Sequence, residues 1–423
     1  MKEYETVKVK IADVKLDKDN PNQFTPEIES RLKRSMKEFG NTQPIIIDKK
    51  TMVLADGEHR LQRYIKEGLE EIPAVLVEFK NDAHRRLYRQ AANKIRGRHD
   101  ENLDAQEYLK IIEAGEKELL KMATGLSITD VEKHLRKQEL LTKEEDFDVE
   151  KELEEIKEPI VKKGEVWQLG SHRLMCGDST KSEDVGLLMS DDKADMVFTD
   201  PPYGVDYAKL NESYIESKNR VQGTKQKKKW EDIKGDELRG KGLKELLVKS
   251  INIIKISSVE NYSVYMCFGA RSTFCLFEIL DEMKINYAIP IVWYKGRFTP
   301  SWHRYHPDYE MIAYFGPGSL PTGKKSRWYG PNNETTQWNL KTDINQEYKH
   351  PTQKPIELSL RAINNSSQEG MIVLDLFGGS GSTLIACEKL QRKCYMMEID
   401  PIYCDVIIKR WEKFTGGKAE KLV

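Results

Sequence analysis

The sequence contains no hydrophobic run long enough to cross a membrane, since a spanning helix needs about 20 consecutive apolar residues. Its first five residues, MKEYE, do not form the apolar segment of a secretory signal. Hydrophobic residues make up only 39% of the chain. These absences predict a cytoplasmic protein that has no membrane partner.

Cysteine is scarce, with six residues in a chain of 423. No two of them have C-x-x-C spacing, and their positions are irregular. This pattern disfavours a thiolate metal site and a disulfide framework. We therefore expect reduced thiols and no metal.

Neither sign of charge dominates, because 68 basic residues face 69 acidic ones and the net charge is −1. Contacts to nucleic acid would therefore depend on local basic surfaces. One basic cluster comprises His84, Arg85, Arg86, Arg89, Lys94, Arg96 and Arg98. It is typical either of a solvated helix face or of a surface that contacts phosphates.

The length suggests two or three domains. Residues 1–80 read as a small α/β domain and residues 81–160 as a helical connector. Within the connector, residues 141–160 are dense in charge and form a linker or linking helix. Residues 161–423 read as a larger α/β domain. A weak helix-turn-helix pattern lies at 123–135, although Asp130 and Glu132 on its second helix would repel phosphates.

Both α/β regions can be divided into elements by their apolar patterns. In the first, strands are expected at 7–9, 44–47, 52–54 and 72–77, and helices at 25–39 and from Gly57 through Tyr64. In the second, seven strands are expected at 173–176, 196–199, 264–267, 290–293, 311–314, 371–374 and 394–397. Helical stretches separate these seven strands, which predicts a doubly wound sheet.

Asp200, Pro201, Pro202 and Tyr203 directly follow an apolar run at 196–198 that is typical of a buried parallel strand. Two prolines stiffen the chain, so a carboxylate is held rigidly at the strand's C-terminal end. Ligands bind at that end of open α/β sheets. The carboxylate can accept hydrogen bonds from an amino group, and the aromatic ring can stack on a flat base. The alternative is an ordinary tight turn.

A glycine-rich turn follows the strand candidate at 371–374. Glycine lets a backbone approach a ligand closely, and an acid about 20 positions further on is placed to bind ribose hydroxyls. Glu398 meets that requirement. The pattern indicates an adenosine-containing cofactor, with a packing loop or a dinucleotide dehydrogenase as alternatives. The candidate residues are Asp375, Phe377, Gly378, Gly379, Gly381, Thr383 and Glu398.

These two motifs, in this order, resemble the β-type amino-methyltransferases that use S-adenosylmethionine. Residues 350–355, HPTQKP, supply a third motif, and the resemblance spans about residues 161–415. It implies a circularly permuted, Rossmann-like methyltransferase sheet in which the strand ending at Cys176 lies beside the strand ending at Glu398. It also implies that Lys354 contacts the methionine end of the cofactor. Asp178 would lie near the cofactor's adenine, or would simply cap a turn.

The same resemblance implies a site-specific DNA methyltransferase acting on a flipped base, with Asp200, Pro201, Pro202 and Tyr203 as its catalytic residues. In this family, Asp at the first motif position favours the 6-amino group of adenine, and serine favours the 4-amino group of cytosine. Both targets remain alternatives, as does a ParB-like DNA-binding protein with a passive methyltransferase-like domain. A role in restriction–modification and a homodimer are further expectations.

Three insertions carry basic and aromatic residues that suit double-stranded DNA. Arginine reads guanine edges, lysine contacts phosphates, and aromatic rings can wedge between bases. A solubilising loop or a core segment would give similar composition. The candidate DNA-binding residues are Lys218, Arg220, Lys227, Lys228, Lys229, Arg297 and Arg304.

Residues 57–60, GEHR, open a helix and resemble the GERR box of the ParB N-terminal family, over about 75 residues. A helix start with free N–H groups and an arginine suits a phosphate. The resemblance implies a nucleotide or phosphate site between Gly57 and Arg60, although His59 replaces an arginine of the box. In the alternative, Glu58 and Arg60 only brace the fold.

Overall fold

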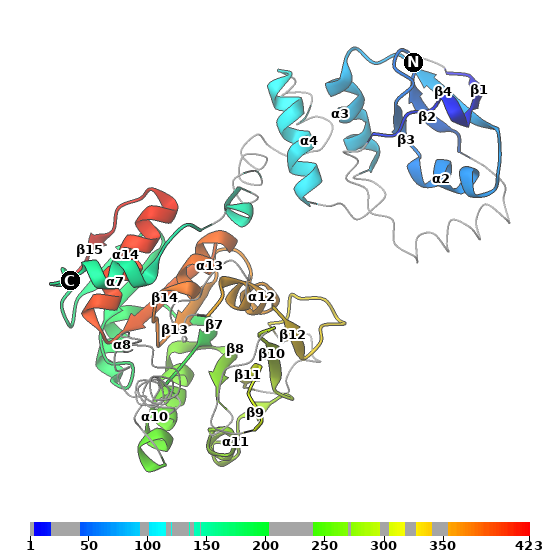
Figure 1. Ribbon diagram of the computed structural model, residues 1–423. Coiled ribbons are helices and arrows are strands. Elements are labelled where there is room, and N and C mark those ends of the chain that lie inside the picture. The colour runs from blue at the N-terminus through cyan, green and yellow to red at the C-terminus, as the bar shows by residue number, and fades with distance from the viewer. Residues whose placement is uncertain are drawn as a thin grey trace, which may run out of the picture. The chain divides into compact units, whose positions relative to one another are not determined.

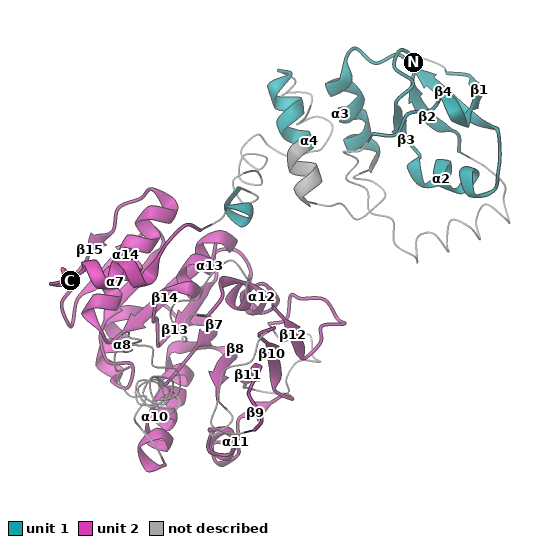
Figure 2. Cartoon of the chain, viewed as in Figure 1, with its two compact units in different colours: residues 1–143 teal, residues 144–423 magenta. Residues whose placement is uncertain are grey.

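The computed structural model (Figure 1) describes residues 4–17, 43–93, 101–115, 120, 135, 139–143, 145–202, 240–269, 272–296, 304–317, 327–340 and 354–423. The chain forms two compact units, residues 1–143 and residues 144–423 (Figure 2). Each unit has its own sheet. None of the helices in the described ranges is long and apolar enough to span a bilayer.

The first unit contains a four-stranded sheet with the order β1-β4-β2-β3. The bounds are β1 Thr6–Lys10, β2 Ile45–Asp48, β3 Leu54–Asp56 and β4 Glu71–Val77, with the 3-10 turn η1 at Ile11–Asp13 and helix α2 at Glu58–Lys66. Side chains from these strands and from α2, among them Ile45, Ile47 and Leu61, form one apolar core. The predicted strands at 7–9, 44–47 and 72–77 and the helix after Gly57 are confirmed.

The third predicted strand of this unit was placed too early. Met52 has a left-handed φ of 59° and donates its N–H to Asp48 O at 2.9 Å, so it belongs to the turn before the strand. The strand begins at Leu54. The helix expected at 25–39 lies outside the described residues.

Helices α3 (Asp82–Asn93) and α4 (Glu101–Glu113) follow the sheet. The basic cluster predicted in α3 is not a solvated face, because Arg85, Arg86 and Arg89 are at most 7% exposed. The guanidiniums of Arg85 and Arg89 lie 2.6 and 3.0 Å from Asp17 Oδ2. Arg89 also pairs with Glu107 of α4. These three arginines therefore stabilise the unit, and phosphate contact is the wrong interpretation for them. Lys94, Arg96, Arg98 and nearly all of the helix-turn-helix pattern lie outside the described residues.

The second unit is built on one sheet with the order β12-β10-β11-β8-β7-β13-β14-β6-β5-β15, and β9 pairs with β11. The bounds are β5 Val166–Leu169, β6 His172–Cys176, β7 Ala194–Thr199, β8 Ser258–Phe268, β9 Asn286–Tyr287, β10 Ile291–Tyr294, β11 Tyr309–Gly316, β12 Gln337–Asn339, β13 Ile372–Asp375, β14 Lys393–Glu398 and β15 Glu420–Lys421. All seven predicted strands are confirmed. The central strands β8, β7, β13, β14 and β6 are mutually parallel.

The permuted order is confirmed by the pairing of β14 with β6, which sets Glu398 opposite Cys176. Strand β6, which comes before β7 and the Asp200 motif in sequence, thus lies beside β14, the parallel strand that comes last in sequence. This arrangement is the one that the resemblance to amino-methyltransferases implied.

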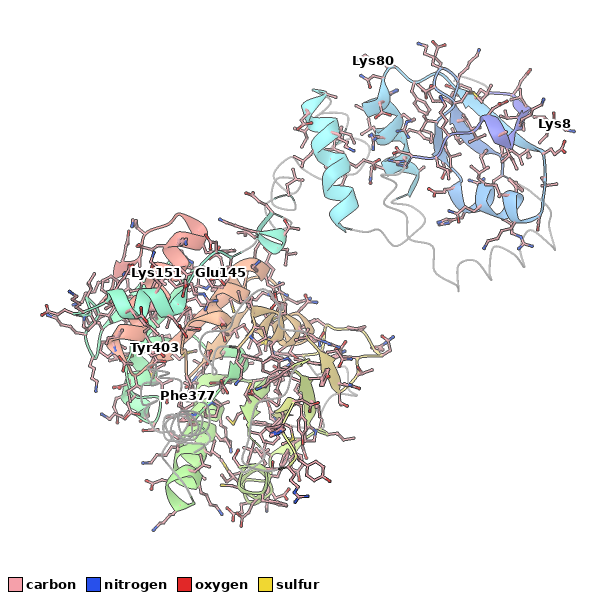
Figure 3. The ribbon with its side chains drawn as sticks, in the orientation of Figure 1. Lys8, Lys80, Glu145, Lys151, Phe377 and Tyr403 are labelled. Carbon is pink, nitrogen blue, oxygen red and sulfur yellow. The ribbon has the colours of Figure 1, made fainter. Side chains whose placement is uncertain are left out.

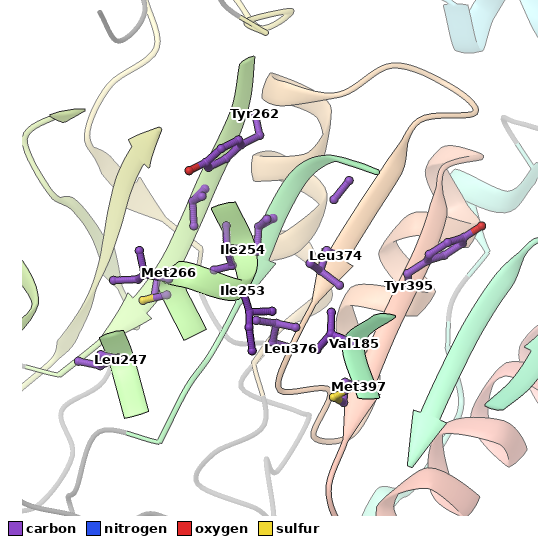
Figure 4. Packing of buried hydrophobic residues seen from close by; sticks show 14 of the residues in the cluster. Val185, Leu247, Ile253, Ile254, Tyr262, Met266, Leu374, Leu376, Tyr395 and Met397 are labelled. Carbon is purple, nitrogen blue, oxygen red and sulfur yellow. The ribbon is translucent and has the colours of Figure 1, made fainter. Parts of the chain in front are cut away.

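Helices cover both faces of this sheet. The bounds are α7 Val149–Glu155, α8 Ser182–Met189, α10 Lys241–Ser257, α11 Thr273–Glu282, α12 Ile356–Ser366, α13 Ser382–Leu390 and α14 Pro401–Thr415. Apolar residues of α8, α10 and α11 pack against one face in a single core that includes Val185, Leu374 and Met397 (Figure 4). Helices α12, α13 and α14 contact one another and the sheet. The result is a three-layer α/β/α unit.

The charge-dense stretch at residues 141–160 contains α7, which packs on α14. Asp148 caps α7 by accepting the N–H of Lys151 at 3.1 Å. The ammonium of Lys409 on α14 lies 3.0 Å from Glu152 Oε2. The prediction of a linker or linking helix at 141–160 therefore includes a helix that belongs structurally to the second unit.

Candidate active site

Four acidic residues meet at one edge of the sheet because they lie where adjacent parallel strands end. Asp200 follows β7, Asp375 ends β13, Glu398 ends β14, and Asp178 follows β6 shortly after Cys176. These strands are neighbours in the order β7-β13-β14-β6, and the carboxyl ends of parallel strands lie at the same edge. The structure thus brings together the two motifs that lie about 180 residues apart in sequence.

Asp200 is half-buried, and Pro201 beside it is buried. The Lys354 ammonium, just before α12, lies 2.9 Å from Asp200 Oδ2. The carboxylate therefore has a fixed cationic neighbour. Pro202 is also described and is partly buried, whereas Tyr203 lies outside the described residues.

The two motifs are joined by a direct hydrogen bond. The hydroxyl of Thr199, the last residue of β7, donates to Asp375 Oδ1 at 3.0 Å, and it accepts the N–H of Leu376 at 3.2 Å. Burial raises the pKa of Asp375 to about 7, against hydrogen bonds from Thr383, the Phe377 N–H and Thr199 that lower it. The side chain of Asp375 thus ties the start of the glycine loop to the strand that carries Asp200.

The glycine loop lies against the end of β14. Gly378 donates its N–H to Met397 O at 2.8 Å, and a Cβ on Gly378 would lie 2.7 Å from Met396 Cγ. Gly379 donates its N–H to Glu398 Oε2 at 2.8 Å, and its φ is +51°. Only glycine permits both the close approach and the left-handed conformation without strain. Gly381, with φ +86°, is the N-cap of α13 and opens that helix towards the loop.

Glu398 is the buried acid of this edge. Its second oxygen, Oε1, accepts the N–H of Asp400 at 2.9 Å. Burial raises the pKa of Glu398 to about 7, although backbone N–H groups of Asp400, Gly379 and Ile399 favour the ionised form. A carboxyl whose pKa is raised towards 7 by burial is a frequent feature of functional sites.

Asp178 follows β6, and β6 is the neighbour of β14, the strand that ends at Glu398. Its Oδ1 accepts the N–H and the hydroxyl of Thr180 at 2.9 and 2.7 Å, so it caps the turn that precedes α8. The Gly177 N–H donates to Glu398 O at 2.9 Å and fixes the two strand ends together. The role of Asp178 towards adenine stays a prediction.

The glycine loop is also held from α14. Arg410 donates to Ser380 O at 2.7 Å and to both oxygens of Glu145, a residue that precedes α7. Arg410 is 2% exposed. Figure 3 labels Phe377 of the loop, Tyr403 of α14 and Glu145. Thr383, predicted as a cofactor contact, is buried in the first turn of α13.

Two residues of the site were missed by sequence reasoning. Glu310 of β11 lies 2.8 Å from the Lys354 ammonium through Oε2, and its Oε1 pairs with the ammonium of Lys295. The available signal was a single charge in the otherwise apolar strand YEMIAYFG. The sequence does not show that this charge faces Lys354, because the two lie on different elements.

Most of the predicted DNA-binding residues lie outside the described residues, namely Lys218, Arg220, Lys227, Lys228, Lys229 and Arg297. Arg304, between β10 and β11, is described and exposed. In the first unit, Arg60 donates to Gln43 O and Pro44 O at 2.7 and 2.9 Å and pairs with Asp56 at 3.2 Å. Arg60 therefore braces the fold.

Within the described part of the chain, no group of three or more His, Cys, Asp or Glu residues is arranged to hold a metal ion. All six cysteines are free thiols, and five of them are buried.

Comparisons with known proteins identify the families that the two parts of the chain match. Residues 194–410 match a family model described as DNA methylase, for N6 and N4 methyltransferases, and residues 1–92 match the ParB N-terminal domain. The chain is 24% identical over 242 residues to the Type II methyltransferase M2.MboI of Moraxella bovis, covering 53% of this chain and 83% of that protein. It is 27% identical over 243 residues to the Type II methyltransferase M2.LlaDCHI of Lactococcus lactis subsp. cremoris, covering 52% and 82%.

Among solved structures, the chain is similar to one described as the M1.HpyAVI–SAM complex, with 23% identity, a TM-score of 0.37, and coverage of 56% of this chain and 98% of that one. Because the DNA methylase model matches half of the chain and spans both motifs of the edge described above, this chain belongs to the N6/N4 DNA methylase family, with a ParB-like domain at its N-terminal side.

Proposed function

We propose that this DNA methyltransferase moves a methyl group from S-adenosylmethionine to the exocyclic 6-amino group of adenine in double-stranded DNA, after the base has been flipped out of its stack. One observation carries the proposal: the 3.0 Å bond between Thr199 and Asp375 joins the strand that presents Asp200 to the glycine loop. An amine acceptor and a cofactor cradle are thereby fixed to each other.

The residues at this edge fit the cofactor chemically. Glu398 can accept hydrogen bonds from ribose hydroxyls, and the loop from Phe377 to Gly381 leaves room for close backbone contact. We assign Asp178 to the adenine of the cofactor. The ammonium of Lys354 suits the methionine carboxylate. When bound, the cofactor supplies an electrophilic sulfonium methyl group, so the chain's own task is mainly orientation.

Asp200 is the residue that would act on the target amine. Its carboxylate and the Pro201 carbonyl can accept the two amino hydrogens, which favours a nucleophilic geometry at nitrogen, and Asp200 can then take up the proton. Pro202 stiffens the segment. Tyr203 would stack on the flipped base.

The choice of adenine over cytosine rests on Asp at the first position of the motif, in the terms of the family that it resembles. The charged environment of Asp200 supports a residue that stays an acceptor. Two of the chain's relatives are Type II methyltransferases, and we propose a restriction–modification setting for this chain also.

For DNA binding, we propose that Lys218, Arg220, Lys227, Lys228 and Lys229 contact phosphates near the flipped base, and that Arg297 and Arg304 take part in target recognition. The working division of the chain is residues 1–80 for docking to DNA or to a partner and 161–423 for methyl transfer, with residues 81–160 connecting them. Within that connection, α3 packs on the first unit and α7 on the second. A phosphate or nucleotide at the backbone N–H groups between Gly57 and Arg60, with the Arg60 guanidinium bracing the fold, a homodimer and a cytoplasmic location complete the proposal.

The test is expression in a host that lacks DNA methylation, followed by single-molecule sequencing of its DNA. We expect N6-methyladenine in one sequence context, and none when Asp200→Ala is expressed at the same level. N4-methylcytosine instead would establish the cytosine alternative. Unmodified DNA from cells that contain folded, S-adenosylmethionine-binding protein would refute the proposal.

A further inference from the structure

Four charged side chains of alternating sign form a continuous row that starts at Asp200. The Lys354 ammonium lies 2.9 Å from Asp200 Oδ2 and 2.8 Å from Glu310 Oε2, and Glu310 in turn pairs with the ammonium of Lys295. The four residues come from separate segments, namely the ends of β7 and β10, strand β11 and the residue before Pro355 and α12. Only the folded sheet brings them together.

The row is largely removed from water, since the side chains of Lys354, Glu310 and Lys295 are 11%, 14% and 17% exposed. Charges in such surroundings need partners, and their mutual influence is stronger than in water. Desolvation alone would raise the pKa of Glu310, but Lys354 and Lys295 outweigh it and lower that pKa to about 2. Glu310 is therefore ionised at every pH at which the protein would work.

We propose that Glu310 is a positioning residue for methyl transfer, because it holds the Lys354 ammonium between two carboxylates. Lys354 then orients Asp200, while the negative charge of Glu310 offsets part of the positive field that Lys354 exerts on Asp200. The inference deepens the proposed function and rests on it. A carboxylate under a weaker positive field is a better acceptor and base for the amino hydrogens.

Lys295 acts at the far end of the same row. It partly neutralises Glu310, and so it sets how much of the Glu310 charge is left to offset Lys354. Asp200 also interacts electrostatically with Asp375 at the end of β13 and with Cys267 on β8. Both residues are present in every variant compared, so the row predicts opposite effects for changes at Glu310 and at Lys295.

The test measures the single-turnover rate of methyl transfer against pH, because single turnover avoids limitation by product release. In Glu310→Gln, the positive charge of Lys354 acts on Asp200 without the offset from Glu310. The acidic limb of the pH–rate profile should therefore move to lower pH by about one unit, and the plateau rate should fall about tenfold. With Lys295→Met, the Glu310 charge offsets Lys354 more strongly, so the acidic limb should move to higher pH.

The control variants are Glu310→Asp, which keeps the charge, and Glu334→Gln, which removes a comparable ion pair between Glu334 and Arg361 (2.6 Å) away from Asp200. Both should leave the acidic limb within about 0.2 unit of wild type. A merely structural row would lower the rate in both Glu310→Gln and Lys295→Met without opposite shifts, and that result overturns the inference. If Glu310→Gln does not fold, Lys295→Met against Glu310→Asp decides by the same criterion.

A second readout needs neither cofactor nor DNA. Because the pKa of Glu310 is lowered on folding, its ionised form contributes stability above the ordinary glutamate range, and this stability is lost as the pH falls towards about 2. Wild type should therefore lose thermal stability more steeply below about pH 4.5 than Glu310→Gln does. A wild type that unfolds normally but transfers no methyl group refutes the proposed function, whereas identical pH profiles in an active enzyme refute only the role of Glu310.

Discussion

Replacing Gly378 with alanine should damage the cofactor loop in a way that its neighbour Gly379 does not. A Cβ on Gly378 would lie 2.7 Å from Met396 Cγ, 2.8 Å from Met396 Sδ and 3.3 Å from Met397 O. Ordinary carbon contacts are about 3.5–4.0 Å, so the loop or the end of β14 must move by nearly 1 Å. Met396 is fully buried and cannot swing into solvent. Overpacking of this kind costs about 1–3 kcal/mol.

Gly379→Ala is the matched control in the same loop. A Cβ at this position meets nothing within 4 Å, and the cost comes only from its φ of +51°. A single non-glycine residue in the left-handed region costs about 1–2 kcal/mol, without moving the loop against β14. The two variants thus separate backbone strain from displacement of the cradle.

The measurements are thermal unfolding and calorimetric titration with S-adenosylmethionine. For a unit of this size, 1 kcal/mol corresponds to about 2–4 °C in Tm, so Gly378→Ala should lower Tm by about 2–12 °C. Its affinity for the cofactor should fall at least about tenfold, equivalent to about 1.4 kcal/mol, while Gly379→Ala should stay within about threefold of wild type. If Gly379→Ala weakens cofactor binding as much as Gly378→Ala, close approach of the loop to β14 is not what shapes the site.

Three further predictions concern single hydrogen-bonding groups. Because the pKa of Glu398 is raised to about 7, cofactor binding should strengthen as the pH rises from about 6 to about 8, and Glu398→Gln should flatten this dependence in calorimetric titrations. Thr199→Val leaves the buried Asp375 carboxyl and the Leu376 N–H without the hydroxyl, and should lower the free energy of unfolding in urea by about 1–3 kcal/mol; an unchanged midpoint contradicts it. Glu145→Gln weakens the ion pair of buried Arg410, so it should lower the free energy of unfolding by about 1–2 kcal/mol and Tm by a few degrees. Because the pair is shielded from solvent, 1 M salt should not lower the Tm of wild type by a similar amount.

The parallel core of the sheet could be predicted from the sequence because its strands are apolar runs that end in turn-forming residues. Strands β9, β12 and β15 were missed since they have only two or three residues, too few for a periodic pattern. Strand β5, with four residues, was missed as well. The permuted order followed from the motif order and was confirmed by the pairing of Glu398 with Cys176. Hydrophobic patterns thus predicted the strands, and the order of the motifs predicted how they are arranged.

Ion pairs between distant residues could not be predicted from the sequence in the same way. Arg85 looked like a surface residue in a basic run, but its partner Asp17 lies 68 residues earlier in the sequence. Lys354 was assigned from a motif, yet its contacts with Asp200 and Glu310 depend on three different elements meeting. Ion-pair partners that are distant in sequence come together only in the folded chain. The electrostatic roles of the site residues therefore could not be predicted from the sequence.

The bond between Thr199 and Asp375 joins residues that are 176 positions apart, and His172 of β6 accepts the N–H of Cys394 across 222 positions. During synthesis, β6 and β7 therefore emerge long before β13 and β14, which fill the space between them. Until then both strands have open edges, and folding dominated by such distant pairings is slow. The first unit, whose sheet is complete by Val77, can fold while the ribosome is still translating the second. The methyl-transfer site is consequently among the last parts of the protein to form, and until then the open strand edges of this unit can pair with other chains.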